Sequence, residues 1–195
     1  MRKTINIENT MAKNTDKNKT PPSMSPENYL KTRARVLPIG TCYVSSDWQE
    51  KGLVTLVVTR VHKNGNFTFG LFLVDLYCLG VKETLYVFNE QGKYHAFLNV
   101  LKEEEEIKEC PYALAHNIIY GAVAYAQDLG FQPAKEFALT RFLLEEDDDS
   151  VELMDIQFGL SGKPAIFIQN EKHADEIIAI LEKNAGPEGY MIIDK

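Results

Sequence analysis

The sequence predicts an α+β protein: an antiparallel β-meander packed by helices, followed by a C-terminal β-hairpin and a helix. Strand-type patterns rich in Val, Leu and Thr gather between residues 41 and 88. Helical periodicity then dominates residues 111–144 and returns at 171–183. Strands that precede helices, rather than alternating with them, are typical of the α+β class.

The N-terminal region favours a short helix and then the meander. Ser25 and Pro26 are a good cap and first residue for a helix that runs to about Arg35. Four strands are expected after it: Cys42–Ser46, Leu53–His62, Phe67–Leu76 and Thr84–Phe88.

The turn Lys63-Asn64-Gly65-Asn66 indicates a hairpin between the second and third strands. A two-residue loop at Asn64-Gly65 would place Lys63 opposite Asn66. One face of the hairpin would then carry Val54, Leu56, Val58, Phe69, Leu71 and Leu73.

The second half predicts helices and a smaller hairpin. Residues 102–109 are an acidic helical or loop segment, and Pro111 to Leu129 carries the clearest apolar stripe, ended by Gly130. A second helix is expected up to about Leu144. A hairpin is expected between 155–159 and 165–169, then a helix over 171–183 capped by Asn170 and an edge strand at 190–193.

The length of 195 residues suits one domain with a tail, predicted as a disordered basic arm over residues 1–27 and a single α+β domain over 28–195. Residues 1–35 contain eight basic and three acidic side chains, whereas the whole chain has a net charge of −7. The arm is either a solvated leader or a contact for a protein or ribonucleoprotein partner. Its candidate contact residues are Lys13, Lys17, Lys19, Lys31, Arg33 and Arg35.

Composition favours the cytoplasm. The three cysteines, Cys42, Cys78 and Cys110, are too few and too scattered for a disulfide framework, which indicates a reducing compartment. No apolar run approaches the ~18 residues of a membrane span, and the polar start lacks a secretory signal. No membrane association is expected.

The densest chemistry in the chain follows the third strand, where Asp75, Cys78 and Lys82 lie within eight residues. Loops that leave a rigid sheet often carry function, so a catalytic site is one interpretation, with Cys78 as nucleophile. The other is structural: Asp75 caps a turn, Cys78 packs as a small apolar residue, and Gly80 supplies the bend.

His116 and Tyr120 are the second pair of candidates, four residues apart on the strongest helix. They would line a cleft as an acid–base pair, or form an ordinary half-buried helix flank.

Nucleotide-binding and common hydrolase motifs are absent from the sequence. The acidic runs at 103–106 and 145–149 lack the ligand pattern of a calcium loop, so no metal or other cofactor is expected.

Two stretches resemble a family of uncharacterised bacterial proteins. The first reads Gly-x-Phe-Leu-Val-Asp-x-x-Cys-Leu-Gly-Val-Lys over residues 70–82, and the second runs from Tyr120-Gly121-Ala122 to Phe131 and Pro133. The resemblance covers about residues 37–143. It implies a bacterial intracellular protein and assigns no activity or functional residue.

These observations predict a non-catalytic binding or regulatory module of the bacterial cytoplasm. The alternative is a small hydrolase or transferase with its site around Asp75, Cys78 and Lys82, approached by His116 and Tyr120.

Overall fold

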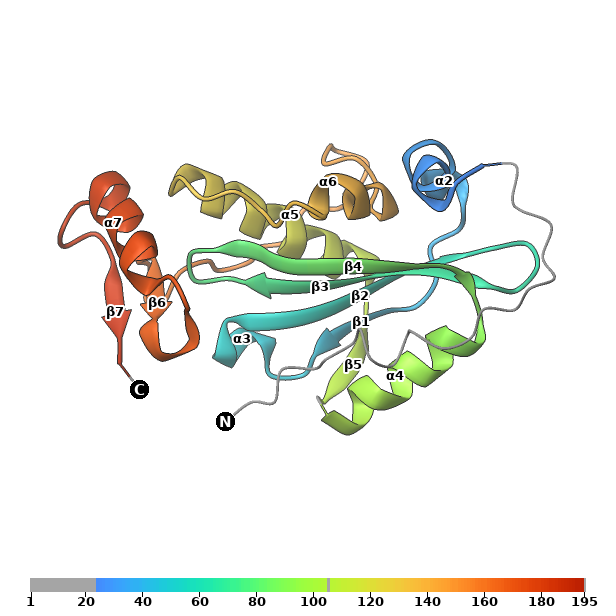
Figure 1. Ribbon diagram of the computed structural model, residues 1–195, viewed down its shortest axis with the longest axis horizontal. Helices are drawn as coiled ribbons and strands as arrows, with labels where there is room; N and C mark the ends of the chain where they lie inside the picture. The colour runs from blue at the N-terminus through green and yellow to red at the C-terminus, as the bar shows by residue number, and fades with distance from the viewer. Residues whose placement is uncertain (1–23, 105, 195) are drawn as a thin grey trace.

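The computed structural model describes residues 24–104 and 106–194, and its centre is a five-stranded antiparallel sheet (Figure 1). The strands are β1 (Cys42–Ser45), β2 (Leu53–Val61), β3 (Phe67–Asp75), β4 (Gly80–Glu90) and β5 (Ile107–Cys110), in the spatial order β4-β3-β2-β1-β5. The short helix α3 (Trp48–Lys51) joins β1 to β2. The α+β class and the meander are confirmed.

Helices cover both faces of the sheet (Figure 1). On one face α5 (Tyr112–Asp128) and α6 (Phe137–Thr140) pack against Val54, Leu56, Val58, Phe72 and Val74. On the other face α4 (Gly92–Glu104) packs through Tyr94, Leu98 and Leu101 against Val57 and Phe69. The sheet is therefore buried on both sides, which explains why every residue of β2 between its two ends is buried instead of every second one.

The predicted hairpin register is wrong by one residue. Leu53 faces Asp75 and Val61 faces Phe67, so Lys63-Asn64-Gly65 forms a three-residue loop instead of a two-residue one. The His62 N–H donates to the Asn66 carbonyl at 2.9 Å, the Gly65 N–H donates to the His62 carbonyl at 3.0 Å, and Gly65 has a φ of 81°. Type I turns followed by a glycine at positive φ are common in such loops.

This one-residue shift moves the side chains of β3 to the opposite faces. Phe72 and Val74, and not Leu71 and Leu73, share a face with Val54 and Leu56. Arg60 consequently faces Thr68.

Several element boundaries differ from expectation. The fourth strand is longer than 84–88, and the segment expected as an acidic helix or loop is the end of α4 followed by the edge strand β5. The helix expected up to Leu144 is only the short α6 and a 3-10 turn, η2 (Arg141–Leu143). The helix over 111–129 is confirmed as α5.

The C-terminal hairpin is a second correction. Residues 155–159 form no strand; Phe158 instead stacks on Tyr125 of α5 with ring centroids 5.6 Å apart. A parallel pair of β6 (Ala165–Phe167) and β7 (Met191–Ile193) takes the place of the hairpin. Helix α7 (Ala174–Ala185) joins these strands and starts after His173; Asn170 instead ends the 3-10 turn η3 (Ile168–Asn170).

The N-terminal helix is confirmed as α2 (Pro26–Arg33), and the Ser25 hydroxyl accepts the Asn28 N–H at 3.3 Å. The helix includes residues 26 and 27, which the predicted disordered arm had covered. Residues 1–23, with Lys13, Lys17 and Lys19, lie outside the described part of the chain. In the described ranges, no helix has both the length and the apolar character needed to cross a bilayer.

Candidate functional site

Asp75 caps the turn between β3 and β4. One carboxylate oxygen, Oδ1, accepts the backbone N–H groups of Tyr77 and Cys78, each at 2.8 Å, and that of Leu79 at 3.2 Å. Burial raises the pKa of this carboxyl above its ordinary value, and the N–H bonds and the nearby Lys82 partly oppose that rise. The Asp75 carboxylate therefore has a structural role, because it accepts the hydrogen bonds that stabilise the turn.

Cys78 is fully buried beneath residues 165–193 (β6, η3, α7 and β7), which we call the C-terminal unit. Its side chain is 0% exposed and packs against Ala126, Ile166 and Leu181, and its thiol donates to the Ala165 carbonyl at 3.1 Å. Burial is the largest cause that raises the pKa of this thiol, and the charge of Asp75 adds to it. A raised pKa keeps the sulfur in the unreactive thiol form.

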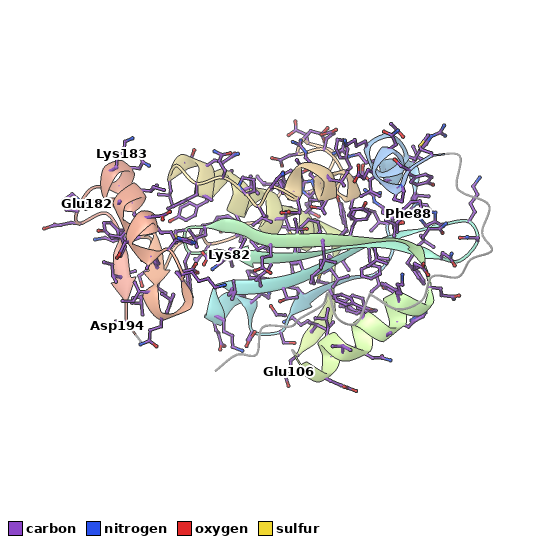
Figure 2. All side chains as sticks on the ribbon, viewed as in Figure 1. Lys82, Phe88, Glu106, Glu182, Lys183 and Asp194 are labelled. Carbon is purple, nitrogen blue, oxygen red and sulfur yellow. The ribbon has the colours of Figure 1, made fainter. Side chains whose placement is uncertain are left out.

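Lys82 lies at the start of β4, where the sheet meets the C-terminal unit (Figure 2). Its ammonium forms a partly buried ion pair with Glu171. The structure thus brings Asp75, Cys78 and Lys82 into one cluster, and adds Glu171 and the Ala165 carbonyl from residues about ninety positions later. Each polar group in this cluster has an internal partner.

His116 and Tyr120 lie elsewhere on α5. Cys78 shares its cluster with Ala126, which is ten residues after His116, so about 15 Å of helix axis separates the position of His116 from the part of α5 that covers the thiol. His95, another possible base, is on α4 at the opposite face of the sheet. None of these histidines is placed to take a proton from Cys78.

His116 and Tyr120 instead hold an extended segment that we call the strap, residues 144–158. It links η2 to the C-terminal unit and contains no regular secondary structure. The His116 Nε2 atom lies 3.2 Å from the Glu146 carbonyl, and the Tyr120 hydroxyl donates to the Glu145 carbonyl at 3.3 Å.

Further α5 side chains form hydrogen bonds with the backbone of the strap. The Tyr112 hydroxyl accepts the Glu145 N–H at 2.6 Å. The Asn117 amide donates to the Glu152 carbonyl at 2.9 Å and accepts the Met154 N–H at 3.0 Å. Side chains at 112, 116, 117 and 120 share one side of the helix, because residues three and four apart are neighbours there.

Two arginines from outside α5 also hold the beginning of the strap. Arg60 of β2 is 1% exposed, and it donates to the Leu143 carbonyl at 2.8 Å and to a Glu145 carboxylate oxygen at 2.8 Å. Arg35 donates to the Leu144 carbonyl at 2.7 Å and pairs with Glu146. Arg35 is therefore engaged internally, whereas Lys31 and Arg33 of the expected arm are exposed on α2.

The strap presents a mixed acidic and apolar surface. Seven of the eleven residues from Glu145 to Asp155 are acidic and none is basic. Leu153, between the two backbone positions that Asn117 holds, is 89% exposed, and Met154 beside it is 36% exposed. Next to the strap, a hollow of about 560 Å³ is lined by Tyr120, Phe137, Arg141 and Asp147.

Metal ligands do not converge in the part of the chain described: no three His, Cys, Asp or Glu side chains there form a group that fits an ion.

Sequence reasoning missed Arg60, Asn117 and Leu153 as residues of interest. Arg60 carried a signal, because a charged residue within the apolar run of β2 must have buried partners. Asn117 and Leu153 carried none, since the length and path of the strap set their roles.

Comparisons with protein-family models, with curated proteins and with solved structures find no match to this chain.

Proposed function

We propose that the protein is a non-catalytic binding module of the cytoplasm whose strap docks on a basic surface of a partner protein. The observation that carries this proposal is the fixed, acidic strap with Leu153 at 89% exposure. A single exposed leucine is ordinary on a protein surface. Here, however, the side chain of Asn117 bonds the backbone on both sides of that leucine.

Holding a contact residue in place before binding supports affinity. A partner then loses less of its interaction energy to ordering the backbone of residues 152–154. The strap resembles a peptide ligand that is already held on a rigid support, with the apolar pair Leu153-Met154 between the acidic residues Glu152 and Asp155. Apolar anchors with a charged rim are the usual composition of protein interfaces.

Charge selects the class of partner. The acidic side chains Glu152 and Asp155 flank the pair Leu153-Met154, and Asp147 to Asp149 precede it without a basic residue. The complementary surface has Lys and Arg around a pocket that accepts a leucine. The exposed Lys31 and Arg33 on α2 extend the proposal to a ribonucleoprotein, where these residues contact phosphate.

The alternative function, a hydrolase or transferase at Asp75, Cys78 and Lys82, has less support. Its nucleophile is 0% exposed, and its acid and its amine hold the turn and Glu171. No observation on the described residues favours it over the binding module.

The test is affinity purification with the full chain as bait, at low and high salt and with and without nuclease. Leu153→Ser is compared with wild type and with Val36→Ser, a matched control because Val36 is also a strongly exposed aliphatic residue, at 76%. The expected result is a partner, identified by mass spectrometry, that is captured by wild type and by V36S and lost with L153S.

The same purification separates the two partner classes. A protein that remains bound after nuclease supports direct docking, whereas one that nuclease releases supports the ribonucleoprotein version. Equal capture by all three baits, or no partner under any condition, contradicts a role for the strap.

A further inference from the structure

Two of the three cysteines face each other across neighbouring strands. In the pairing of β1 with the edge strand β5, Cys42 lies directly opposite Cys110. Facing residues of an antiparallel pair project to the same side of the sheet. Both side chains accordingly contact the core beneath α5, and both are free thiols.

This placement suits a disulfide. Facing residues in antiparallel strands have Cα atoms about 4.5–5.5 Å apart, and disulfide-bonded cysteines have Cα separations of about 4.4–6.8 Å. Their Cβ atoms, usually about 4.5–5.5 Å apart, must approach to about 3.5–4.5 Å. Within the described residues, the four-residue strand β5 pairs with β1 alone, so it can make that movement of about 1 Å.

We propose that Cys42 and Cys110 are a modification site that forms a reversible disulfide by exchange with a low-molecular-weight disulfide. The Cys110 thiolate attacks one sulfur of the small disulfide, forms a mixed disulfide and releases one small thiolate. The Cys42 thiolate then attacks the Cys110 sulfur and releases the second small thiolate. The two protein thiols lose two electrons and two protons, and the small disulfide becomes two thiols.

Exposure sets the order of attack. Cys110 is partly exposed on the edge strand, whereas Cys42 is 2% exposed and acts as the resolving cysteine. Burial raises the pKa of both thiols, that of Cys110 to about 12, so exchange is slow at neutral pH. The pair stays reduced under reducing conditions and responds to sustained oxidation.

Cys78 supplies an internal control. It is 0% exposed and lies among residues of the C-terminal unit, in a different part of the core from Cys42 and Cys110. Exchange that merely followed cysteine content would involve all three thiols, whereas exchange that follows strand pairing spares Cys78.

The experiment treats the reduced full chain with excess oxidised glutathione at mildly alkaline pH and follows intact mass and cysteine-containing peptides. The expected product is a monomer lighter by two hydrogens, with a peptide linking Cys42 to Cys110, and dithiothreitol reverses it. The new ring ties β5 to β1, so the oxidised protein should melt roughly 5 °C or more above the reduced protein.

Two variants sharpen the result. Cys78→Ser should give the same linked peptide, and Cys42→Ala should stop at a glutathione adduct on Cys110. The proposal is overturned if wild type accumulates only that adduct, links Cys78, forms a dimer through Cys110, or remains unmodified. The linked peptide is read in wild type, so the outcome does not depend on either variant folding.

Discussion

Arg60 and Glu145 form an ion pair that joins the central strand of the sheet to the beginning of the strap. Nη1 of Arg60 lies 2.8 Å from Oε1 of Glu145, and their side chains are 1% and 34% exposed. The same guanidinium also donates to the Leu37 and Leu143 carbonyls, at 2.9 and 2.8 Å. One buried cation thus ties together β2, the segment before β1 and the end of η2.

Removing Glu145 should destabilise the protein more than removing its neighbour. Glu145→Ala leaves the buried Arg60 without its counter-charge, and we expect a loss of about 2–3 kcal/mol, below the ~3–5 kcal/mol of a fully buried pair because Glu145 is partly hydrated. Glu146→Ala removes the more exposed partner of Arg35 and should cost less than about 1 kcal/mol. Urea unfolding midpoints of the two variants measure the difference.

A double variant tests the cause of that loss. In Arg60→Met/Glu145→Ala the charge and its partner leave together, so the total cost should be smaller than the sum of the two single costs. Equal midpoints for Glu145→Ala and Glu146→Ala would mean that Arg60 does not depend on the Glu145 carboxylate.

The Asp75 cap predicts different results for two substitutions. Asp75→Ala leaves three N–H groups without their acceptor and should cost about 1–3 kcal/mol. Asp75→Asn keeps an acceptor oxygen and should cost less. Denaturant unfolding of both variants checks this order, and a larger cost for Asn than for Ala would argue that the turn needs the charge.

The pH dependence of Asp75 follows from the direction of its pKa shift. Its folded pKa is raised, so the pH-dependent part of its contribution to stability is complete below its unfolded pKa and is lost as pH rises through its folded pKa. Relative to Asp75→Asn, wild type should therefore be more stable at acid pH than at neutral pH. Unfolding curves of the pair across that range give the sign directly.

The sequence predicts local features of this fold well and distant ones poorly. The helix α5, the Ser25 cap and the strands β2 and β3 depend on neighbouring residues, and all four are present. The loop length at Gly65 depends on tertiary packing of both sheet faces, because both possible registers bury apolar side chains. A short loop motif alone therefore does not decide between them.

The candidate site also combines local contacts, which the sequence predicts, with contacts to distant residues, which it does not. Asp75, Cys78 and Lys82 are close because they share one turn, which their spacing in the sequence indicates. Glu171 and the Ala165 carbonyl reach that turn only because β6 and α7 pack on it. These later residues bury Cys78 and bond to its thiol and to Lys82, so the cluster has a structural role and its thiol is not accessible to a substrate.

Cys78 should therefore resist alkylation in the folded protein. It is 0% exposed and its pKa is raised, so iodoacetamide should modify Cys110 first and reach Cys78 only on unfolding. Peptide mapping of alkylated cysteines with and without urea measures the order. Rapid modification of Cys78 in the native protein would revive the enzyme alternative.

Asn117 should control the order of the strap around Leu153. Asn117→Ala removes the bonds to the Glu152 carbonyl and the Met154 N–H, and we expect faster hydrogen exchange at Met154 with a stability loss of about 1 kcal/mol. The matched control is Asn184→Ala, because the Asn184 amide also donates to a backbone carbonyl, that of Leu129, away from the strap. N184A should leave exchange at Met154 unchanged.

Partner capture by N117A tests whether the fixed backbone around Leu153 contributes to binding. Weaker capture, with Leu153 itself intact, would show that it does. Unchanged capture would show that Leu153 binds without the support of Asn117.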